Sequence, residues 1–268
     1  MAGSCPSCCG NSWPPEHAID FLNTALPAGW ALASFIVAAA LLARAVRRAP
    51  WRILAEDFRL HGWIGAAFAI ALAWILSARL GGPLTLHLLI TPLVALMFGR
   101  DLAVVAAIPA LAAVLLWRGG DWTGAAATWL LAAWLPASLL DALRRAADRW
   151  VPRNPFTFIF LAGFFAPGAA YVATVLLAAL AHALAGTASW DTLAEGFIPF
   201  GLLLGWGEAF LTGLLTAIFV VYEPRWMATF DDARYLRPPD GRALAGAATG
   251  ASAPPTTPRP RRKPRPGW

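Results

Sequence analysis

Long apolar stretches, separated by short polar or basic connections, occupy most of residues 28–222. The stretch 197–222 is long enough to cross a bilayer, and Glu208 is its single charged residue. At 100° per residue its small and polar positions share one helical face, made of Gly201, Gly205, Glu208, Thr212 and Thr216. This pattern predicts a transmembrane helix whose polar seam, centred on Gly205, Glu208 and Thr212, packs against other helices.

Glu208 is costly at this depth, by about 2.5–3.5 kcal/mol on insertion scales for charged residues at a helix centre. Two roles would explain its presence. The carboxylate could form part of an ion or substrate path, since intramembrane ionisable groups often do. Alternatively, it could be a buried polar contact that fixes the packing of neighbouring helices. The sequence leaves both roles open.

The other apolar stretches predict six further spans. Five stretches precede residue 197, at 28–46, 61–78, 84–117, 122–143 and 155–185. Residues 84–117 are too many for one ordinary crossing and are interrupted by Gly99-Arg100-Asp101, so we expect two short helices hinged at Gly99. Pro136 predicts a kink in the fifth span, and Gly163, Pro167 and Gly168 predict a bent or broken sixth span.

Charge distribution supports two passes in residues 84–117. With seven spans, 19 of the 21 Lys and Arg residues lie in connections on one side, which is the cytoplasmic side by the positive-inside rule. We therefore predict an all-α polytopic integral membrane protein, with about seven transmembrane helices, the N-terminus outside and the C-terminus cytoplasmic. Residues 1–27 would form an extracytoplasmic Cys-containing tail, 28–236 the membrane domain, and 237–268 a disordered, basic, Pro- and Arg-rich cytoplasmic tail.

Composition agrees with a membrane protein, because 59% of the residues are hydrophobic and only 13% are charged. The net charge of +6 follows from the topology, so we expect membrane lipid as a partner and no nucleic acid. The basic cluster 259–265 could contact anionic lipid or simply solubilise the tail.

Three of the four histidines fall at the predicted external side, together with all three cysteines. His87 would lie in the first turn of the third span, with Thr91 one turn further on the same face. These imidazole and thiol groups, from His17, His87, His182, Cys5, Cys8 and Cys9, are typical ligands of late first-row metals. The alternative is a chance grouping, with cysteines free or in disulfides and histidines buried for packing.

Three common sequence motifs of hydrolases and nucleotide-binding proteins are absent from the sequence. It has no His-Glu-x-x-His, no Gly-x-Ser-x-Gly and no Gly-x-x-x-x-Gly-Lys. We therefore expect no enzymatic activity and no cofactor, and any ATP hydrolysis would belong to a separate subunit.

Two stretches resemble the CbiM/NikM membrane component of energy-coupling-factor cobalt and nickel importers, which are ABC-type transporters. They are the Leu-His-Leu-Leu run 86–89, with its short helix to Gly99, and the Gly-Glu-Ala-Phe-Leu-Thr-Gly run 207–213. Residues 16–27 are more loosely similar to the opening of that family, and the resemblance covers about 16–236. It implies seven helices in the bacterial inner membrane and external capture of a cobalt or nickel ion for cobalamin or nickel-enzyme synthesis. It also implies a transmembrane coupling subunit and cytoplasmic ATPase subunits as partners.

The resemblance also implies a metal site. In the family the N-terminal amine, the histidine directly after it and the histidine of the His-Leu-Leu motif bind the ion, so His17 and His87 would be the two histidines. Here His17 is internal and has no α-amine beside it. Either Cys5, Cys8 or Cys9 substitutes, or a protease trims the tail, or this branch has lost the metal. In the last case the chain would be a non-transporting membrane scaffold or assembly factor.

Overall fold

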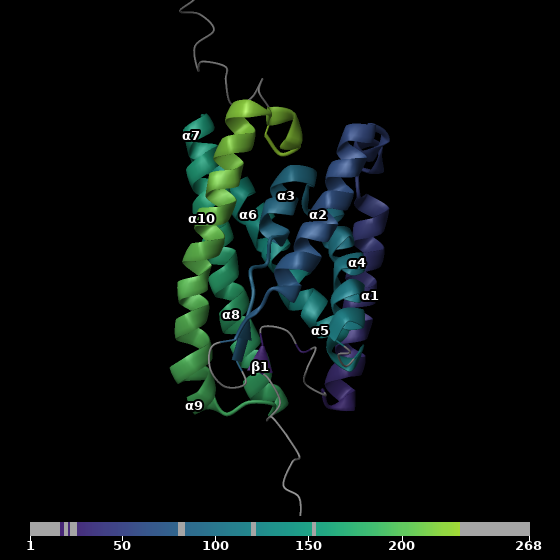
Figure 1. Ribbon diagram of the computed structural model, residues 1–268, viewed down its shortest axis with the longest axis vertical. Coiled ribbons are helices and arrows are strands. Elements are labelled where there is room, and N and C mark those ends of the chain that lie inside the picture. The colour runs from purple at the N-terminus through teal and green to yellow at the C-terminus, as the bar shows by residue number, and fades with distance from the viewer. Residues whose placement is uncertain are drawn as a thin grey trace, which may run out of the picture.

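Helices that run along one common axis make up most of the structure, which is a computed structural model (Figure 1). It describes residues 17–18, 21, 26–79, 84–118, 122–151 and 154–230. Within these residues six helical stretches are long and apolar enough to cross a membrane, at Ala28–Arg48, Asp57–Ile75, Arg100–Arg118, Trp122–Trp150, Pro155–Ala185 and Trp190–Tyr222. The prediction of a helical multi-pass membrane protein is therefore confirmed, whereas the count of seven transmembrane helices is not.

Three of these stretches are regular helices and three are composite. The regular ones are α1 (Ala28–Arg48), α2 (Asp57–Ile75) and α4 (Arg100–Arg118). The composite ones join α5 (Ala125–Trp129) to α6 (Leu135–Trp150), α7 (Pro155–Thr157) to α8 (Ala166–Ala185), and α9 (Trp190–Thr192) to α10 (Ile198–Tyr222). Short 3-10 turns, namely η1 (Trp51–Ala55), η2 (Trp122–Gly124) and η6 (Pro224–Trp226), flank them.

Each composite helix contains a π-helical segment that ends just before a proline. These segments are η3 (Leu130–Trp134), η4 (Phe158–Phe165) and η5 (Leu193–Phe197), and Pro136, Pro167 and Pro199 follow them. Proline has no N–H to offer the carbonyl one turn back, and a π turn re-pairs the backbone around that gap. The helices thus depart from regular α-helix next to Pro136 and Pro167, while the predicted kink at Pro136 and the predicted bend or break of the sixth span stay predictions.

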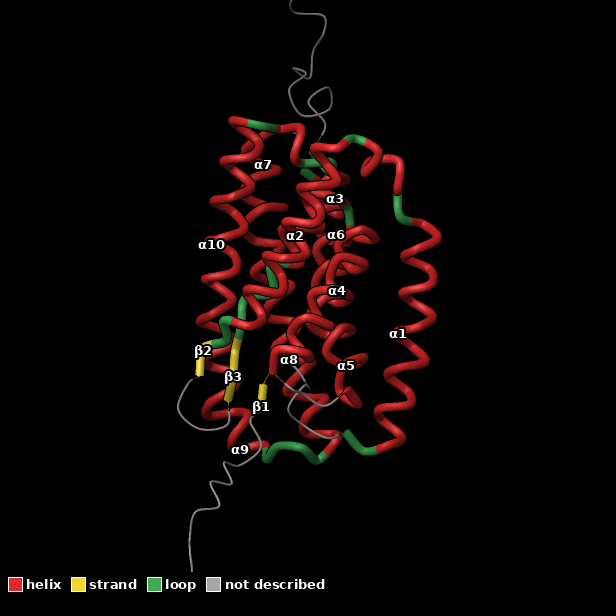
Figure 2. The backbone as a smooth tube through the Cα atoms, turned by 45° about the vertical axis from the view of Figure 1, so that its right-hand side comes forward, coloured by secondary structure: helices red, strands yellow, loops and turns green. Residues whose placement is uncertain are grey.

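The third predicted span differs from the expected helix. It consists of strand β3 (Leu84–Leu86), a non-helical loop at residues 87–90, and the eight-residue helix α3 (Thr91–Phe98). Figure 2 shows this segment rising along the bundle before the chain turns back into α4. The turn occurs at Gly99, whose φ of 88° suits glycine, so the predicted hinge is confirmed. The prediction that His87 and Thr91 lie one helical turn apart is wrong, because the helix begins only at Thr91.

A small sheet, not predicted, joins the N-terminal segment to this span. Strand β1 (His17–Ala18) pairs in parallel with β3, and β2 (Ala78–Arg79) pairs with β3 on its other edge in antiparallel fashion. The Cα of His17 is opposite that of Leu84. Residues 17, 18 and 21 of the predicted tail are therefore part of the folded protein, while the predicted tail at 237–268 lies outside the described residues.

Helix α10 buries the polar seam as predicted. Gly201, Gly205, Glu208, Thr212 and Thr216 are all buried, while Leu203 and Phe210 are 68% and 65% exposed. Glycines allow the close approach, since a Cβ at Gly201 would overlap Val175 of α8. The seam therefore packs against protein, and the opposite side of α10 presents a surface suited to lipid.

The two ends of the bundle differ in charge. One end, at the top of Figure 1, carries the end of α1, η1, the start of α2 and the end of α10. We call it the arginine-rich end, for Arg44, Arg47, Arg48, Arg52, Arg59 and Arg225. The other end carries the sheet, and we call it the sheet end. Arg118 of α4 lies toward this end, where its guanidinium donates to Trp74 O at 2.6 Å and Ser77 Oγ at 2.7 Å. It thereby satisfies carbonyl groups at the C-terminus of α2.

Candidate functional site

The loop at residues 87–90 is a break in regular structure inside the bundle, between β3 and α3 (Figure 2). His87 is 1% exposed, and Leu89 is fully buried. Non-helical backbone at such a depth is tolerated only where protein or enclosed water satisfies its polar groups. The partners of this backbone are therefore the first question about the site.

Side chains from three helices supply those partners. Tyr171 of α8 donates its hydroxyl to His87 O at 3.0 Å, and Trp74 of α2 donates its indole N–H to Leu89 O at 3.2 Å. Glu208 of α10 accepts the N–H of Leu89 at 2.9 Å and that of Ile90 at 3.0 Å. Trp74, Tyr171 and Glu208 are all fully buried. Together these four hydrogen bonds fix the loop, because they come from three different packed helices.

Ile90 carries local strain at the end of this loop. Its φ of 59° makes it the one non-glycine residue with positive φ among those the structure describes. That conformation is unfavourable for a β-branched residue, and strain of this kind persists only where its surroundings impose it. The bond from Ile90 N–H to Glu208 is one such constraint.

Glu208 also faces the N-terminus of α3, for which Ile90 is the N-cap residue. A carboxylate near this end is favoured by the helix dipole and by the N–H groups that have no partner within the helix. Both carboxylate oxygens accept backbone N–H groups. This geometry favours the packing role for Glu208 over a place on an ion path.

The backbone of His17 lies beside the strand that leads to His87. His17 is level with Leu84 in the β1–β3 pair, three residues before His87, which is about 10 Å of extended chain. His17 thus lies in a strand next to β3, and His87 is the first residue after β3. The side chain of His17 lies outside what the structure describes, as do Cys5, Cys8 and Cys9.

His182 is engaged in packing near the end of α8. Its ring is fully buried and stacks on Phe21, with centroids 4.0 Å apart and planes at 16°. Its Nδ1 is 2.8 Å from Thr187 Oγ1. The candidate ligand role of His182 stays a prediction, but these contacts give the imidazole a structural function in holding the N-terminal segment.

Phe21 itself is fixed by η2 and α5. Its N–H donates to Thr128 Oγ1 at 2.9 Å, and that hydroxyl donates to Gly124 O at 3.0 Å. A Cβ at Gly124 would overlap the carbonyl of Phe21, so glycine is required for this approach. The N-terminal segment is therefore anchored four residues after His17.

The described residues contain no group of three or more His, Cys, Asp or Glu side chains that could hold a metal. Within that part of the chain the site offers one buried imidazole, His87, whose Nδ1 is 3.2 Å from Leu88 O and whose ring centroid is 5.5 Å from that of Trp74. Neutral imidazole is a usual ligand of late first-row ions.

The fold and this site define a multi-pass membrane protein in which one span is broken around a buried histidine. A family model described as the cobalt uptake substrate-specific transmembrane region, CbiM, matches residues 22–226. The chain therefore belongs to the CbiM family, whose members are membrane components of cobalt transporters that work with other subunits. No curated protein and no solved structure matches the chain significantly.

Trp74, Tyr171 and Phe21 were not predicted as part of the site. A signal for two of them exists in the sequence. Tyr171 is one of three tyrosines, and like Trp74 it lies within an apolar span. Buried Tyr and Trp side chains usually find hydrogen-bond partners, so each indicates an acceptor within the bundle. No comparable signal identifies Phe21.

Proposed function

We propose that this chain is the substrate-capture component of an energy-coupling-factor importer for cobalt or nickel ions. The ion, which is the substrate, would bind at the sheet end through His87 and His17. Cys5, Cys8 or Cys9 would complete the set of ligands, since no α-amine lies beside His17. The captured ion would supply cobalamin or nickel-enzyme synthesis.

The observation that carries this proposal is the pairing of β1 with β3, which brings the backbone of His17 to the strand that leads into His87. These residues are 70 positions apart in the sequence, yet His17 pairs with Leu84, only three residues before His87, or about 10 Å of extended chain. Two imidazole side chains directed toward one another from such positions can share one ion. Membership of the CbiM family supports the same substrate class.

Orientation follows from the positive-inside rule. The arginine-rich end would face the cytoplasm and the sheet end the outside, so the site would meet external ions. A coupling subunit in the membrane and ATPase subunits in the cytoplasm would then drive uptake, because the chain has no phosphate-binding loop of its own.

Metal analysis of the purified protein tests the proposal. Wild-type protein exposed to Co²⁺ or Ni²⁺ should retain about one ion per chain, and His87→Ala should retain none. His61→Ala is a matched control, because His61 is an exposed histidine at the arginine-rich end. Equal and negligible metal in wild type and His87→Ala would remove the site.

A co-purification experiment distinguishes a transporter component from a non-transporting membrane scaffold. A transporter component should recover an ATP-binding subunit in a pull-down, and its deletion should lower metal uptake. A scaffold that keeps the fold without the metal site would recover other membrane proteins and leave uptake unchanged. That second result would contradict the importer role and support the scaffold role.

A further inference from the structure

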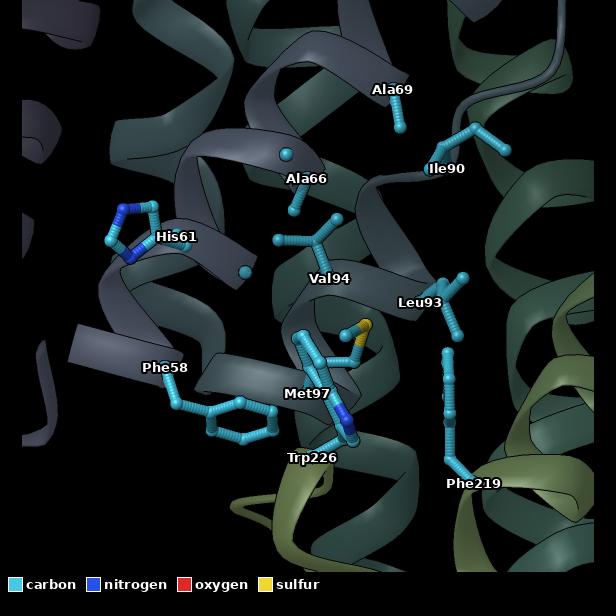
Figure 3. Close-up of a pocket in the computed structure, with 12 residues that line it drawn as sticks. Phe58, His61, Ala66, Ala69, Ile90, Leu93, Val94, Met97, Phe219 and Trp226 are labelled. Carbon is cyan, nitrogen blue, oxygen red and sulfur yellow. The ribbon is translucent and has the colours of Figure 1, made fainter. Parts of the chain in front are cut away.

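A lateral groove of about 620 Å³ lies between α2, α3 and α10 in the half of the bundle nearest the arginine-rich end. Its lining is apolar apart from His61 at the edge. Figure 3 shows Phe58 and Trp226 at one end of the groove and Ala69 and Ile90 at the other. Small residues of α2 leave it open, since a Cβ at Gly65 would have no atom within 4 Å.

The groove matches one leaflet of a membrane in length. From Phe58 to Ala69 helix α2 rises roughly 16 Å, and half of a typical hydrocarbon core is about 15 Å. The inner end touches Ile90, the last residue of the loop that contains His87. The groove is therefore long enough to reach from the membrane surface to about the middle of a bilayer.

A second cavity, of about 690 Å³, lies next to the outer end of the groove. Its lining includes Arg52, Arg59 and Arg225. Arg59 pairs with Glu56 at 3.0 Å and Arg225 with Glu223 at 2.7 Å, so three arginines face two carboxylates and Arg52 supplies the unbalanced charge.

Only a thin aromatic wall divides the two cavities. Phe58 and Trp226 line the groove and pack edge to face at 4.2 Å, and the guanidinium of Arg225 lies 5.8 Å from the centre of the Phe58 ring. An apolar slot thus adjoins a cavity with an excess of positive charge.

We propose that these two cavities together bind one anionic phospholipid from the leaflet at the arginine-rich end. Its phosphate would lie in the cavity lined by Arg52, Arg59 and Arg225, and one acyl chain would fill the groove toward Ile90. The charge of the cavity complements an anionic headgroup, and the leaflet-length groove complements a hydrocarbon chain.

The shape of the groove favours an acyl chain over a partner helix. The wall of Phe58 and Trp226 closes the path that a continuous helix would take along the groove to the bundle end. A flexible acyl chain can instead pass around this wall on the lateral side of the groove, so that its head reaches the neighbouring cavity.

Native mass spectrometry can test this with protein released from nanodiscs of phosphatidylglycerol or of phosphatidylcholine with the same acyl chains. Gly65→Leu adds a side chain to the groove at a position where a Cβ meets no atom within 4 Å, and it replaces glycine by a better helix former. Gly29→Leu is the matched control, because Gly29 of α1 also has open space around it but lies away from the groove. Arg52→Gln tests the headgroup cavity, with Arg149→Gln as an exposed control outside that cavity.

Wild type and Gly29→Leu should each retain one lipid, with a preference for phosphatidylglycerol. Gly65→Leu should lose the retained lipid in both kinds of nanodisc. Arg52→Gln should keep it but lose about fivefold of the preference for phosphatidylglycerol, while Arg149→Gln keeps that preference. If Gly65→Leu fails to fold, the smaller filling Ala69→Leu replaces it. Unchanged lipid retention in a folded, filled variant overturns the proposal, and so does loss of a co-purifying membrane subunit with the lipid retained.

Discussion

The carboxylate of Glu208 on α10 accepts the backbone N–H of Ile90 at 3.0 Å, 118 residues away in the sequence. Ile90 is held there in a left-handed conformation that its side chain disfavours, and it forms the junction between the 87–90 loop and α3. One buried carboxylate thus fixes both the broken span and the start of the helix that follows it.

Glu208→Ala should lower the free energy of unfolding by about 2–4 kcal/mol, since it leaves two buried N–H groups without their acceptor. Glu208→Gln should cost less, because the amide oxygen can still accept one of these bonds. Chemical unfolding in detergent measures both. Glu195→Ala is the control, at an exposed carboxylate that precedes the same helix, and it should stay within about 0.5 kcal/mol of wild type. Equal stability of the two alanine variants would refute the role given to Glu208.

Ile90→Gly should be tolerated better than the same change at Ile108. Both isoleucines are half-buried, but Ile108 lies within α4 whereas Ile90 has positive φ. Glycine relieves strain of about 1–2 kcal/mol at Ile90 and weakens the helix at Ile108 by about 1 kcal/mol. The difference in unfolding free energy between the two variants should therefore favour Ile90→Gly. A larger loss of stability at Ile90 would show that its backbone is not strained in solution.

His182→Phe should retain bound Co²⁺ or Ni²⁺, because a phenyl ring can still stack on Phe21. His182→Ala should instead increase proteolysis of the N-terminal segment, since the stacking surface is lost. His87→Phe is the matched comparison and should lose the ion. If His182→Phe lost as much metal as His87→Phe, His182 would be a ligand. That outcome would agree with its predicted position at the external side.

A membrane-impermeant maleimide should label Cys5, Cys8 or Cys9 in intact cells when these thiols are reduced. The reason is the predicted position of the sheet end outside the cytoplasm. In a cysteine-free background, Arg149→Cys at the opposite end should react only after the cells are permeabilised. The reverse pattern of labelling would invert the topology.

The last helix could be predicted closely from the sequence. Its 3.6-residue periodicity is strong, and the cost of an isolated carboxylate in hydrocarbon requires that Glu208 face other helices. The predicted span 197–222 differs from α10 by one residue, and the exposed and buried faces agree with the prediction. Local pattern was sufficient there because each residue's environment follows from its position on one regular helix.

The third span could not be predicted in the same way. Residues 84–98 are apolar apart from Thr85, His87 and Thr91, and nothing in their order distinguishes a helix from an extended segment. The extended form is stable at this depth because Trp74, Tyr171 and Glu208 satisfy its backbone, from 15, 84 and 119 residues away. The position of His87 is therefore set by tertiary contacts.

The docking of the N-terminal segment against the bundle could not be predicted from the sequence either. It was expected to be a tail, but Phe21 is buried against His182 and bonded to Thr128, which is 107 residues away. A segment of this length is too short to show a periodic signal of such docking. Its burial depends on the space at Gly124, a property of the partner surface.

A double-mutant cycle on metal affinity tests the central claim most directly, since that claim is one ion held jointly by His17 and His87. Co²⁺ and Ni²⁺ titrations would compare wild type, His17→Ala, His87→Ala and the double variant. Each single change should weaken binding strongly, and the double variant should bind no worse than His87→Ala alone, because ligands of one ion are not additive. Affinity that is unchanged in His17→Ala, or losses that simply add, would contradict a shared site.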